Sequence, residues 1–303
     1  MNCAACGSGD VVPWAHARDV EYQSVPDTFA FVRCRACGAL SLEHPPTDRL
    51  DRIYPENYYS FAAADDGAVQ HVKDWLDRRW FRSVTRKLPG AALSALDVGG
   101  GSGHQLDALR RADRRVARTV VVDLDRGAEA AAVAAGHEFV RARIEDADLR
   151  GPFDVILVLN LIEHVADPGA VLRRVRDLVS PTGMILVKTP NIDSLDARVF
   201  RHRNWGGYHC PRHWVLFTQE SFASAARRAG LRVRSWSYTQ GAPFWTVSIL
   251  AWLDAIGATR VNAQRPAWQH PLYAPLAAVF AAFDFLRRPV SRLSQMTFAL
   301  TQD

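Results

Sequence analysis

Apolar and polar positions follow two patterns that alternate from residue 93 onward. Continuous apolar runs of strand length occupy residues 93–98, 118–125, 138–142, 153–160 and 184–190. Amphipathic segments with helical spacing occupy residues 104–112, 126–136, 167–183 and 218–230. Two late strands are expected at residues 231–239 and 295–302. This alternation predicts an α/β fold, a doubly wound parallel sheet with helices on both faces.

The chain before residue 93 has a different pattern. Residues 44–60 are rich in proline and tyrosine and are expected to form a linker that packs down. Its Tyr54, Tyr58 and Tyr59 are either packing residues or part of a substrate entrance. A helix follows, and one stripe of it, predicted to pack on the core, carries Val72, Trp75, Leu76, Trp80, Val84 and Leu88. We therefore expect residues 43–90 to be a linker and a helix.

Residues 241–293 interrupt the pattern before the last strand with two strongly apolar stretches. Asp254 and Asp284 break these stretches, which are too short to span a bilayer. Tryptophans and arginines accompany them, a combination typical of segments that lie in a membrane interface. We expect a hydrophobic helical insertion, acting either as a lid on the core or as a peripheral membrane contact at the inner membrane surface.

The loop after the first predicted strand of this sheet is the strongest chemical signal. Gly99, Gly101 and Gly103 have the spacing G-x-G-x-G, and no lysine follows as a P-loop requires. Asp97 lies at the end of the preceding strand, where its carboxylate would repel a phosphate. Since ligands of such sheets bind at the carboxyl ends of the strands, this loop is expected to hold a ligand with positive charge.

Several motifs in this order resemble class I S-adenosylmethionine-dependent methyltransferases, in the group that includes quinone-biosynthesis O-methyltransferases. They are "LDVGGGSG" (96–103), "VVVDLD" (120–125), the segment from "FDVILVLNLIEHVADP" onward, and "WGGYHCPRHWVLFTQESF" (205–222). The resemblance covers about residues 90–240 and the last strand. It implies a Rossmann-like methyltransferase domain over residues 91–303, with S-adenosylmethionine as cofactor.

The same resemblance assigns the cofactor-binding residues. The backbone of Gly99, Gly101 and Gly103 would approach the methionine part of the cofactor, and Asp97 would hold its ammonium group. Asp123 would accept hydrogen bonds from the ribose hydroxyls, with Asp125 as the alternative. The remaining expected contacts are Glu145 or Asp146 at the adenine and Asn160 near the methionine part.

Two copies of C-x-x-C-G lie near the N-terminus, at Cys3 and Cys6 and at Cys34 and Cys37. Two residues between thiolates let both sulfurs reach one metal ion, and four thiolates form a closed, structural zinc site. Residues 1–42, the N-terminal unit, are therefore expected to be a zinc ribbon that depends on its metal. The sequence opens without a secretory signal, and paired cysteines of this kind favour a cytoplasmic protein.

Methyl transfer to many acceptors requires a base that removes the acceptor's proton. Glu163 and His164 follow the fourth strand, and His209 and His213 lie in "YHCPRHW". We expect His164, His213 and Glu163 to be catalytic, with a structural role for each histidine as the alternative. A metal site formed by His209, Cys210 and His213 is a weaker alternative.

The 303 residues carry a net charge of +5, 48% apolar residues and 23% charged residues. These values are ordinary for a globular protein. We expect a small or lipid-linked acceptor of the sugar or quinone-precursor type, because the pairing with a ribbon also resembles sugar C-methyltransferases. The alternative is an rRNA or tRNA methyltransferase whose ribbon binds RNA. The basic and aromatic residues that the ribbon could offer to RNA are few, namely Arg18, Arg33, Arg35, Trp14 and Phe31.

Overall fold

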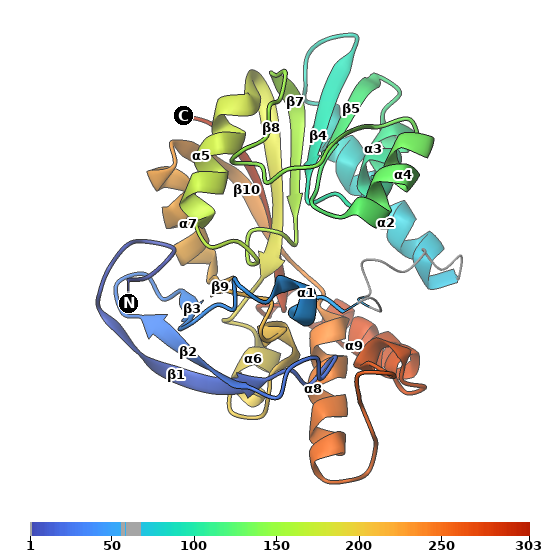
Figure 1. The fold of residues 1–303 in the computed structure, drawn as a ribbon. Helices are drawn as coiled ribbons and strands as arrows, with labels where there is room; N and C mark the ends of the chain where they lie inside the picture. Colours follow the sequence, from blue (N-terminus) through green and yellow to red (C-terminus); the bar gives the residue numbers. More distant parts are fainter. Residues whose placement is uncertain (1, 56–57, 59–67) are drawn as a thin grey trace.

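A computed structural model describes residues 2–55, 58 and 68–303, and a seven-stranded sheet forms its centre (Figure 1). The strand order is β10-β11-β8-β7-β4-β5-β6. Neighbouring strands from β8 to β6 are parallel, and β11 is antiparallel to both β8 and β10. The bounds are β4 Leu93–Val98, β5 Val116–Val122, β6 Glu138–Val140, β7 Phe153–Leu159, β8 Val179–Pro190, β10 Leu231–Thr239 and β11 Gln295–Gln302. The predicted α/β class is confirmed.

Helices bury both faces of this sheet. Side chains alternate along each strand, so Leu96 packs into one apolar cluster and its neighbour Ala95 into another. The first cluster includes side chains of α5 and α7, and the second includes side chains of α2, α3 and α4. These helices are α2 Ala68–Thr85, α3 His104–Ala112, α4 Arg126–Ala134, α5 Pro168–Leu178 and α7 Gln219–Arg228.

Two expectations about these helices need correction. The helix predicted over 167–183 ends at Leu178, and β8 begins at the next residue. Pro181 explains this, because it has no N–H to donate and disfavours helical backbone at the residue before it. In α2 the predicted core stripe is wrong at Trp75 and Leu76, which are 55% and 51% exposed.

Among the described side chains of α2, the buried ones lie in its C-terminal half, and α2 packs against α3. Phe81, Val84 and, just beyond the helix, Leu88 are buried there, while the N-terminal half of α2 extends beyond the sheet (Figure 1). A stripe of apolar residues therefore continues past the surface that it could cover. The side chain of Val72 and the whole of Tyr59 lie outside the described part of the structure.

The N-terminal unit forms a second, four-stranded sheet of order β1-β2-β3-β9. Its strands are β1 Val11–Arg18, β2 Thr28–Cys34, β3 Leu40–Leu42 and β9 Val215–Leu216. The short helix α1 Leu50–Ile53 follows β3 in the sequence. The last strand, β9, comes from the methyltransferase-like part and pairs antiparallel with β3. Residues 1–42 thus share a sheet with a segment far along the chain.

The insertion at 241–293 contains a helical hairpin, α8 Ala242–Ala255 and α9 Tyr273–Arg287, with the 3-10 turn η3 Ala267–Gln269 between them. The ring of Trp245 on α8 stacks on Phe280 of α9, with ring centres 5.0 Å apart. Helix α6 Leu195–Val199 and the 3-10 turn η2 Gly206–Tyr208 lie nearby. Within the described residues, none of the helices has the length and apolar character needed to cross a membrane.

Candidate active site

The glycine loop, residues 99–103, leaves the end of β4 and leads into α3. All three predicted glycines have left-handed backbone, with φ of 71°, 52° and 81° at Gly99, Gly101 and Gly103. A Cβ on Gly99 would lie 2.8 Å from Leu161, and one on Gly103 would lie 2.3 Å from His137. A Cβ on Gly101 would meet no described atom within 4 Å. Gly99 and Gly103 are therefore fixed by packing, while Gly101 faces open space that a ligand could use.

Asp97 lies buried beneath this loop. Its Oδ2 has no hydrogen-bond partner among the described residues, and burial, with the nearby Asp123 carboxylate, raises the pKa of Asp97 to about 8. A buried carboxyl with an unpartnered oxygen is costly unless a ligand supplies a donor. Asp97 therefore has an unused acceptor oxygen, and an ammonium group such as that of S-adenosylmethionine could donate to it.

Asp123 follows β5 and faces the glycine loop. Its Oδ2 accepts a hydrogen bond from Gly101 N at 2.8 Å, and its Oδ1 accepts one from Asp125 N at 2.9 Å. Asp125 has a different role, because its side chain caps α4 by accepting from Gly127 N at 2.7 Å. Of the two acids considered for the ribose, Asp123 is the one beside the loop.

The other expected cofactor residues lie at the same end of the sheet. Glu145 and Asp146 follow β6 and both have exposed side chains, so the structure does not choose between them. Asn160 follows β7, with φ of 53°, and its side-chain oxygen accepts from Gln295 Nε2 at 3.3 Å. These positions fit the carboxyl edge at which such sheets bind ligands.

A second group of polar side chains forms the histidine cluster, which we define as His164, His209, His213 and Glu163. The loop after β7 supplies two of them and the segment between η2 and β9 supplies the others. The rings of His164 and His213 have centres 4.7 Å apart, and those of His209 and His213 are 4.9 Å apart. The structure thus brings together all the base candidates of the sequence.

Glu163 is fully buried at the base of this cluster. Thr189 Oγ1 donates to its Oε2 at 3.0 Å, while Oε1 has no hydrogen-bond partner within the described ranges and lies 3.9 Å from His213 Nε2. Burial raises the pKa of Glu163 to about 8. At neutral pH this carboxyl is therefore mostly protonated and can donate a hydrogen bond.

His164 and His213 are held neutral. Burial, with the neighbouring His209 and Arg212, lowers the pKa of His164 to about 3. Burial and the other two histidines lower the pKa of His213 well below its usual value. The Nδ1 of His213 lies 2.8 Å from Gly207 O, and because a carbonyl only accepts, Nδ1 donates and Nε2 is left as an acceptor. These imidazoles suit the orientation of an acceptor through hydrogen bonds.

The N-terminal part of the chain completes this cluster with residues that the sequence did not single out. In the connection between β1 and β2, Glu21 Oε2 lies 2.5 Å from His209 Nδ1, and Asp19 forms a fully buried ion pair of 2.9 Å with Arg212. Tyr54 and Tyr58, expected from the sequence to be either packing or substrate-entrance residues, also join the cluster. Their hydroxyls lie 3.0 Å from His164 Nδ1 and His209 Nε2. No periodic pattern marks an acid buried by a distant segment, so Glu21 and Asp19 could not have been found from the sequence.

The alternative metal site of His209, Cys210 and His213 is not formed. Cys210 is buried and its thiol donates to Ala17 O at 3.6 Å, so it belongs to the contact with β1. Burial and Asp19 raise the pKa of this thiol, which keeps it protonated. Cys210 therefore has a packing role.

The four cysteines of the N-terminal unit do converge. Cys3 Sγ lies 3.7 Å from Cys37 Sγ, Cys6 Sγ lies 3.6 Å from Cys34 Sγ, and all four sulfurs lie within 4.8 Å of one another. Gly7 and Gly38, which follow the pairs, have φ of 78° and 81° as tight metal-binding turns require. Four free thiols at this spacing fit a tetrahedral zinc ion.

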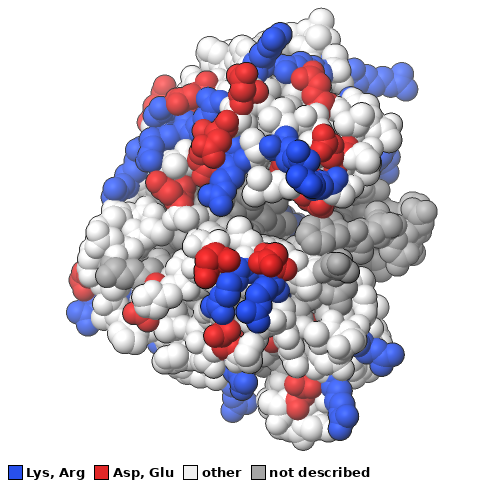
Figure 2. Space-filling view, viewed as in Figure 1, with Lys and Arg blue, Asp and Glu red and all other residues white. Residues whose placement is uncertain are grey.

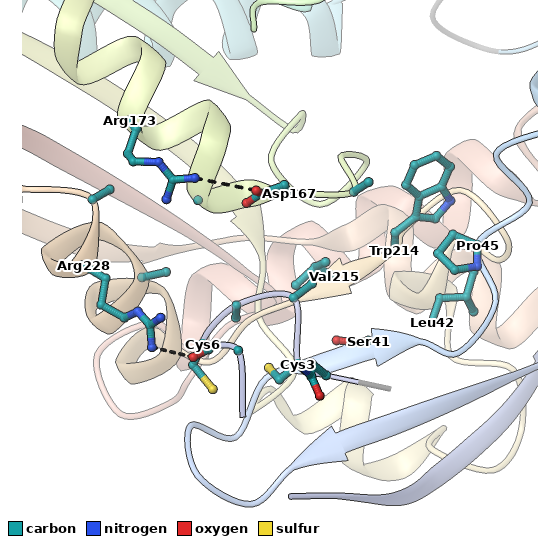
Figure 3. Close-up of a pocket in the computed structure, with 18 residues that line it drawn as sticks. Cys3, Cys6, Ser41, Leu42, Pro45, Asp167, Arg173, Trp214, Val215 and Arg228 are labelled. Carbon is teal, nitrogen blue, oxygen red and sulfur yellow. Dashed lines mark hydrogen bonds and ion pairs between the residues drawn. The ribbon is translucent and has the colours of Figure 1, made fainter. Parts of the chain in front are cut away.

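A cavity of about 500 Å³ is lined by Cys3 and Cys6 on one side and by residues of α5 and α7 on the other (Figure 3). Arg228 of α7 crosses its edge to the carbonyl of Cys6, and Arg173 of α5 pairs with Asp167. Trp214, next to the histidine cluster in sequence, forms part of the wall. The hydrogen bond at the edge of this cavity is a second contact between the N-terminal unit and the central domain, besides the pairing of β3 with β9.

Two observations bear on RNA binding by the ribbon. The guanidinium groups of Arg33 and Arg201 both lie over the ring of Trp14, which donates to Tyr208 Oη at 3.0 Å. Phe31 is buried and stacks on Tyr208. On the face shown in Figure 2, basic and acidic side chains are interspersed. The aromatic residues that RNA would need for stacking are thus already used inside the protein.

The arrangement of the strands, the glycine loop and the acid after β5 define the fold of class I S-adenosylmethionine-dependent methyltransferases. A family model described as "Methyltransferase domain" matches residues 71–235. The match covers more than half of the chain, and the chain belongs to this family.

Curated relatives are ubiquinone biosynthesis O-methyltransferases. The protein of Caulobacter sp. (strain K31) is 33% identical over 130 residues, which are 41% of this chain and 51% of the relative. The protein of Nitrobacter winogradskyi is 27% identical over 207 residues, which are 59% of this chain and 73% of the relative. The chain therefore spans about half the length of the first of these relatives.

Solved structures share the fold at low sequence identity. Coclaurine N-methyltransferase, bound to N-methylheliamine and SAH, has a TM-score of 0.52 at 13% identity and covers 80% of this chain and 76% of its own. The [4+2]-cyclase SpnF has a TM-score of 0.50 at 15% identity, with 79% and 84% covered. A cyclase among these neighbours shows that the fold alone does not define the reaction.

Proposed function

We propose that this protein transfers a methyl group from S-adenosylmethionine to an oxygen or carbon of a small or lipid-linked acceptor, of the sugar or quinone-precursor type. The observation that carries the proposal is the buried, unpartnered Asp97 carboxyl beneath the open position at Gly101. An ammonium ligand would favour the ionised form of Asp97 and be bound by it, whereas a phosphate would gain nothing from this carboxyl. The curated relatives, named as O-methyltransferases, favour oxygen as the acceptor atom.

When bound, S-adenosylmethionine supplies a methyl group activated by its sulfonium. Asp97 would hold the ammonium, Asp123 the ribose hydroxyls, and Glu145 or Asp146 the adenine. The backbone at Gly99, Gly101 and Gly103 would approach the methionine part, with Asn160 beside it. Each oxygen of Asp123 already accepts one backbone N–H, which fixes the orientation of the carboxylate. Each oxygen keeps a second lone pair that could accept from a ribose hydroxyl.

The histidine cluster is proposed to receive the acceptor. Neutral His164 and His213 would orient the acceptor's hydroxyl. Glu163 would donate a hydrogen bond to this hydroxyl when it is protonated and would accept its proton when it is ionised. Glu163 and His213 are buried and His164 is half-buried. The little water near them would leave each of their hydrogen bonds to the acceptor stronger.

We further propose that Cys3, Cys6, Cys34 and Cys37 hold a structural zinc ion. Zinc would fix the turns that begin and end the N-terminal unit, and thereby its hairpin between β1 and β2. This hairpin carries Glu21 into the histidine cluster. The metal would act on the reaction only through the position of this hairpin.

The hairpin of α8 and α9 is the proposed contact for a lipid-linked acceptor at the inner membrane surface of the cytoplasm. Helix α8 packs on η2, where Ser248 Oγ accepts from Gly206 N at 2.8 Å. Beyond it, apolar side chains are exposed at Trp252, Ile256, Phe283, Phe285, Leu286 and Val290. The exposed Arg288 follows α9 and suits anionic headgroups, whereas Arg292 is paired with Asp193.

The test has two stages. Titration calorimetry first measures binding of S-adenosylmethionine, and the absence of binding at millimolar concentration rejects the proposal. The methyl-labelled cofactor is then incubated with the protein and a host-cell extract, and labelled products are identified by mass. Label in a small or lipid-soluble product supports the proposal, while label in RNA would replace it with the RNA alternative. Sedimentation with anionic and neutral vesicles, and with a F285S/L286S variant, tests the membrane contact.

A further inference from the structure

We propose that Glu21 and His209 form a proton-accepting pair for the acceptor's hydroxyl, and that Tyr58 links His209 to that hydroxyl. This inference rests on the proposed function and deepens it, because it identifies the acceptor as a hydroxyl compound that must lose its proton. It also gives the N-terminal unit a direct part in the reaction, since Glu21 lies in the hairpin between β1 and β2.

The hydrogen bonds determine where each proton lies. Glu21 Oε2 is 2.5 Å from His209 Nδ1, and a carboxylate only accepts, so Nδ1 carries the proton. Nε2 is then an acceptor, and the Tyr58 hydroxyl at 3.0 Å donates to it. The three side chains are 8%, 7% and 5% exposed, so water does not compete strongly for these contacts. The chain of donors runs from Tyr58 through His209 to Glu21.

His209 differs from the two other histidines of the cluster. Among the three histidines, and within the described residues, His209 alone lies within hydrogen-bond distance of a carboxylate. His213 gives its Nδ1 proton to a carbonyl and is 3.9 Å from Glu163, whose carboxyl is kept mostly protonated by burial. A carboxylate partner fixes the tautomer of an imidazole and stabilises the imidazolium that forms when it accepts a proton.

The charge next to this pair is balanced. Arg212 lies beside the cluster, with its guanidinium 5.8 Å from the centre of the Tyr58 ring. Its charge is matched by Asp19 in the buried ion pair of 2.9 Å. Glu21 also interacts with Arg212 at longer range, but Asp19 makes the direct ion pair. Glu21 therefore remains available to stabilise a positive charge on His209.

Protons and electrons balance in the proposed transfer. The acceptor's hydroxyl gives its proton to the Tyr58 oxygen as Tyr58 gives its own proton to His209 Nε2. The acceptor oxygen forms a bond to the methyl carbon, and the carbon–sulfur bond breaks with its electron pair on sulfur. The imidazolium of His209, held by Glu21, returns a proton through Tyr58 to water after the product leaves. Tyr58 would touch the acceptor, and Glu21 would be a positioning residue.

The experiment compares Glu21→Gln, Glu21→Asp, His209→Gln and Tyr58→Phe with the wild type, and uses Glu43→Gln as the matched control in the same region. Catechol and 4-nitrocatechol serve as acceptor probes, because the nitro compound is ionised near neutral pH and needs no base. With catechol, we expect kcat to fall by about 100-fold or more in E21Q, H209Q and Y58F, with KM little changed. E21D should retain part of the activity, E43Q all of it, and 4-nitrocatechol should restore E21Q to near the wild-type rate.

Proton NMR tests the same pair without any acceptor. The Nδ1 proton of His209 should appear far downfield in the wild type and in E43Q and should be absent in E21Q. Absence of this signal in the wild type, or equal catechol turnover by E21Q and wild type, overturns the inference. So does a wild type that binds S-adenosylmethionine but methylates neither catechol. Failure to bind S-adenosylmethionine at all rejects instead the proposed function.

Discussion

The glycine loop and the histidine cluster lie at the same end of the central sheet, but the chain builds them in different ways. The loop side comes from neighbouring strands, β4 and β5, and its contacts are mostly made by backbone N–H groups. The histidine side joins the hairpin between β1 and β2, the side chains of Tyr54 and Tyr58, the loop after β7 and the segment before β9.

This difference divides what is general from what is particular. The loop side combines backbone atoms with acids that lie close to it in the fold, and we propose that it binds the cofactor shared by the family. The side chains of the histidine cluster, which come from distant segments, are proposed to bind the acceptor. The family match, at residues 71–235, begins after Glu21, Tyr54 and Tyr58 and so leaves them out. If this division is correct, a substitution can lower methyl transfer without lowering the affinity for S-adenosylmethionine, and another can lower that affinity directly.

Removal of the proposed zinc ion should give the largest difference between the two sides, with methyl transfer lost and cofactor binding kept. We expect Cys34→Ser, or a strong chelator, to unfold the N-terminal unit and to lower methyl transfer by about 100-fold or more, since Glu21 is then lost from the cluster. Binding of S-adenosylmethionine should persist, because the glycine loop does not include that unit. Metal analysis and calorimetry on the same samples check this, and simultaneous loss of cofactor binding would contradict it.

Asp19→Asn should have the next largest effect, on stability. It leaves Arg212 charged and buried without its partner, which costs about 3–5 kcal/mol. The matched control is Asp27→Asn, in the same hairpin, whose ion pair with Arg49 is partly exposed and contributes about 0–1 kcal/mol. Urea denaturation measures both, and equal losses would show that Arg212 finds another partner.

Asp123→Ala tests the loop side. Because charged acceptors contribute about 1.5–3 kcal/mol per hydrogen bond, the affinity for S-adenosylmethionine should fall by about 10-fold to 100-fold. Asp125→Ala is its control, which removes the cap of α4 at a cost of about 1 kcal/mol in stability and should leave affinity almost unchanged. The reverse order of the two affinities would assign the ribose to Asp125.

The smallest expected effect is a pH dependence of cofactor binding. The pKa of Asp97 is about 8 in the free protein, so the carboxyl is mostly protonated at pH 7. An ammonium ligand favours the carboxylate, and binding should therefore release protons. Affinity should rise by less than tenfold from pH 7 to pH 8, and calorimetry in buffers of different ionisation enthalpy should detect the released proton. Proton uptake would show that Asp97 does not contact the ammonium.

The sequence could predict the loop side because its signals are local. Glycine spacing, an acid at a strand end and alternating strands and helices each lie within a few residues, and the structure places Gly101, Asp97 and Asp123 together as expected. The wrong prediction at 179–183 also has a local cause, since Pro181 ends the helical pattern before Gly183 does.

The histidine side could be predicted only in part. "IEHV" and "YHCPRHW" supplied the histidines and Arg212. Glu21, the partner of His209, and Asp19, the partner of Arg212, come from a hairpin about 190 residues away in sequence. Such contacts follow from the tertiary fold and leave no periodic signal. The exposed Trp75 has the same cause, because a helical stripe does not show where the surface that it covers ends.

Strand β9 has a consequence for the order in which the protein is made. A chain emerges from the ribosome with its N-terminus first, so the cysteines and the first three strands appear early. Their sheet lacks its fourth strand until Val215 and Leu216 have been synthesised. During most of translation the edge of β3 therefore has no β9 to pair with. The N-terminal unit and the central domain can complete their shared sheet only together.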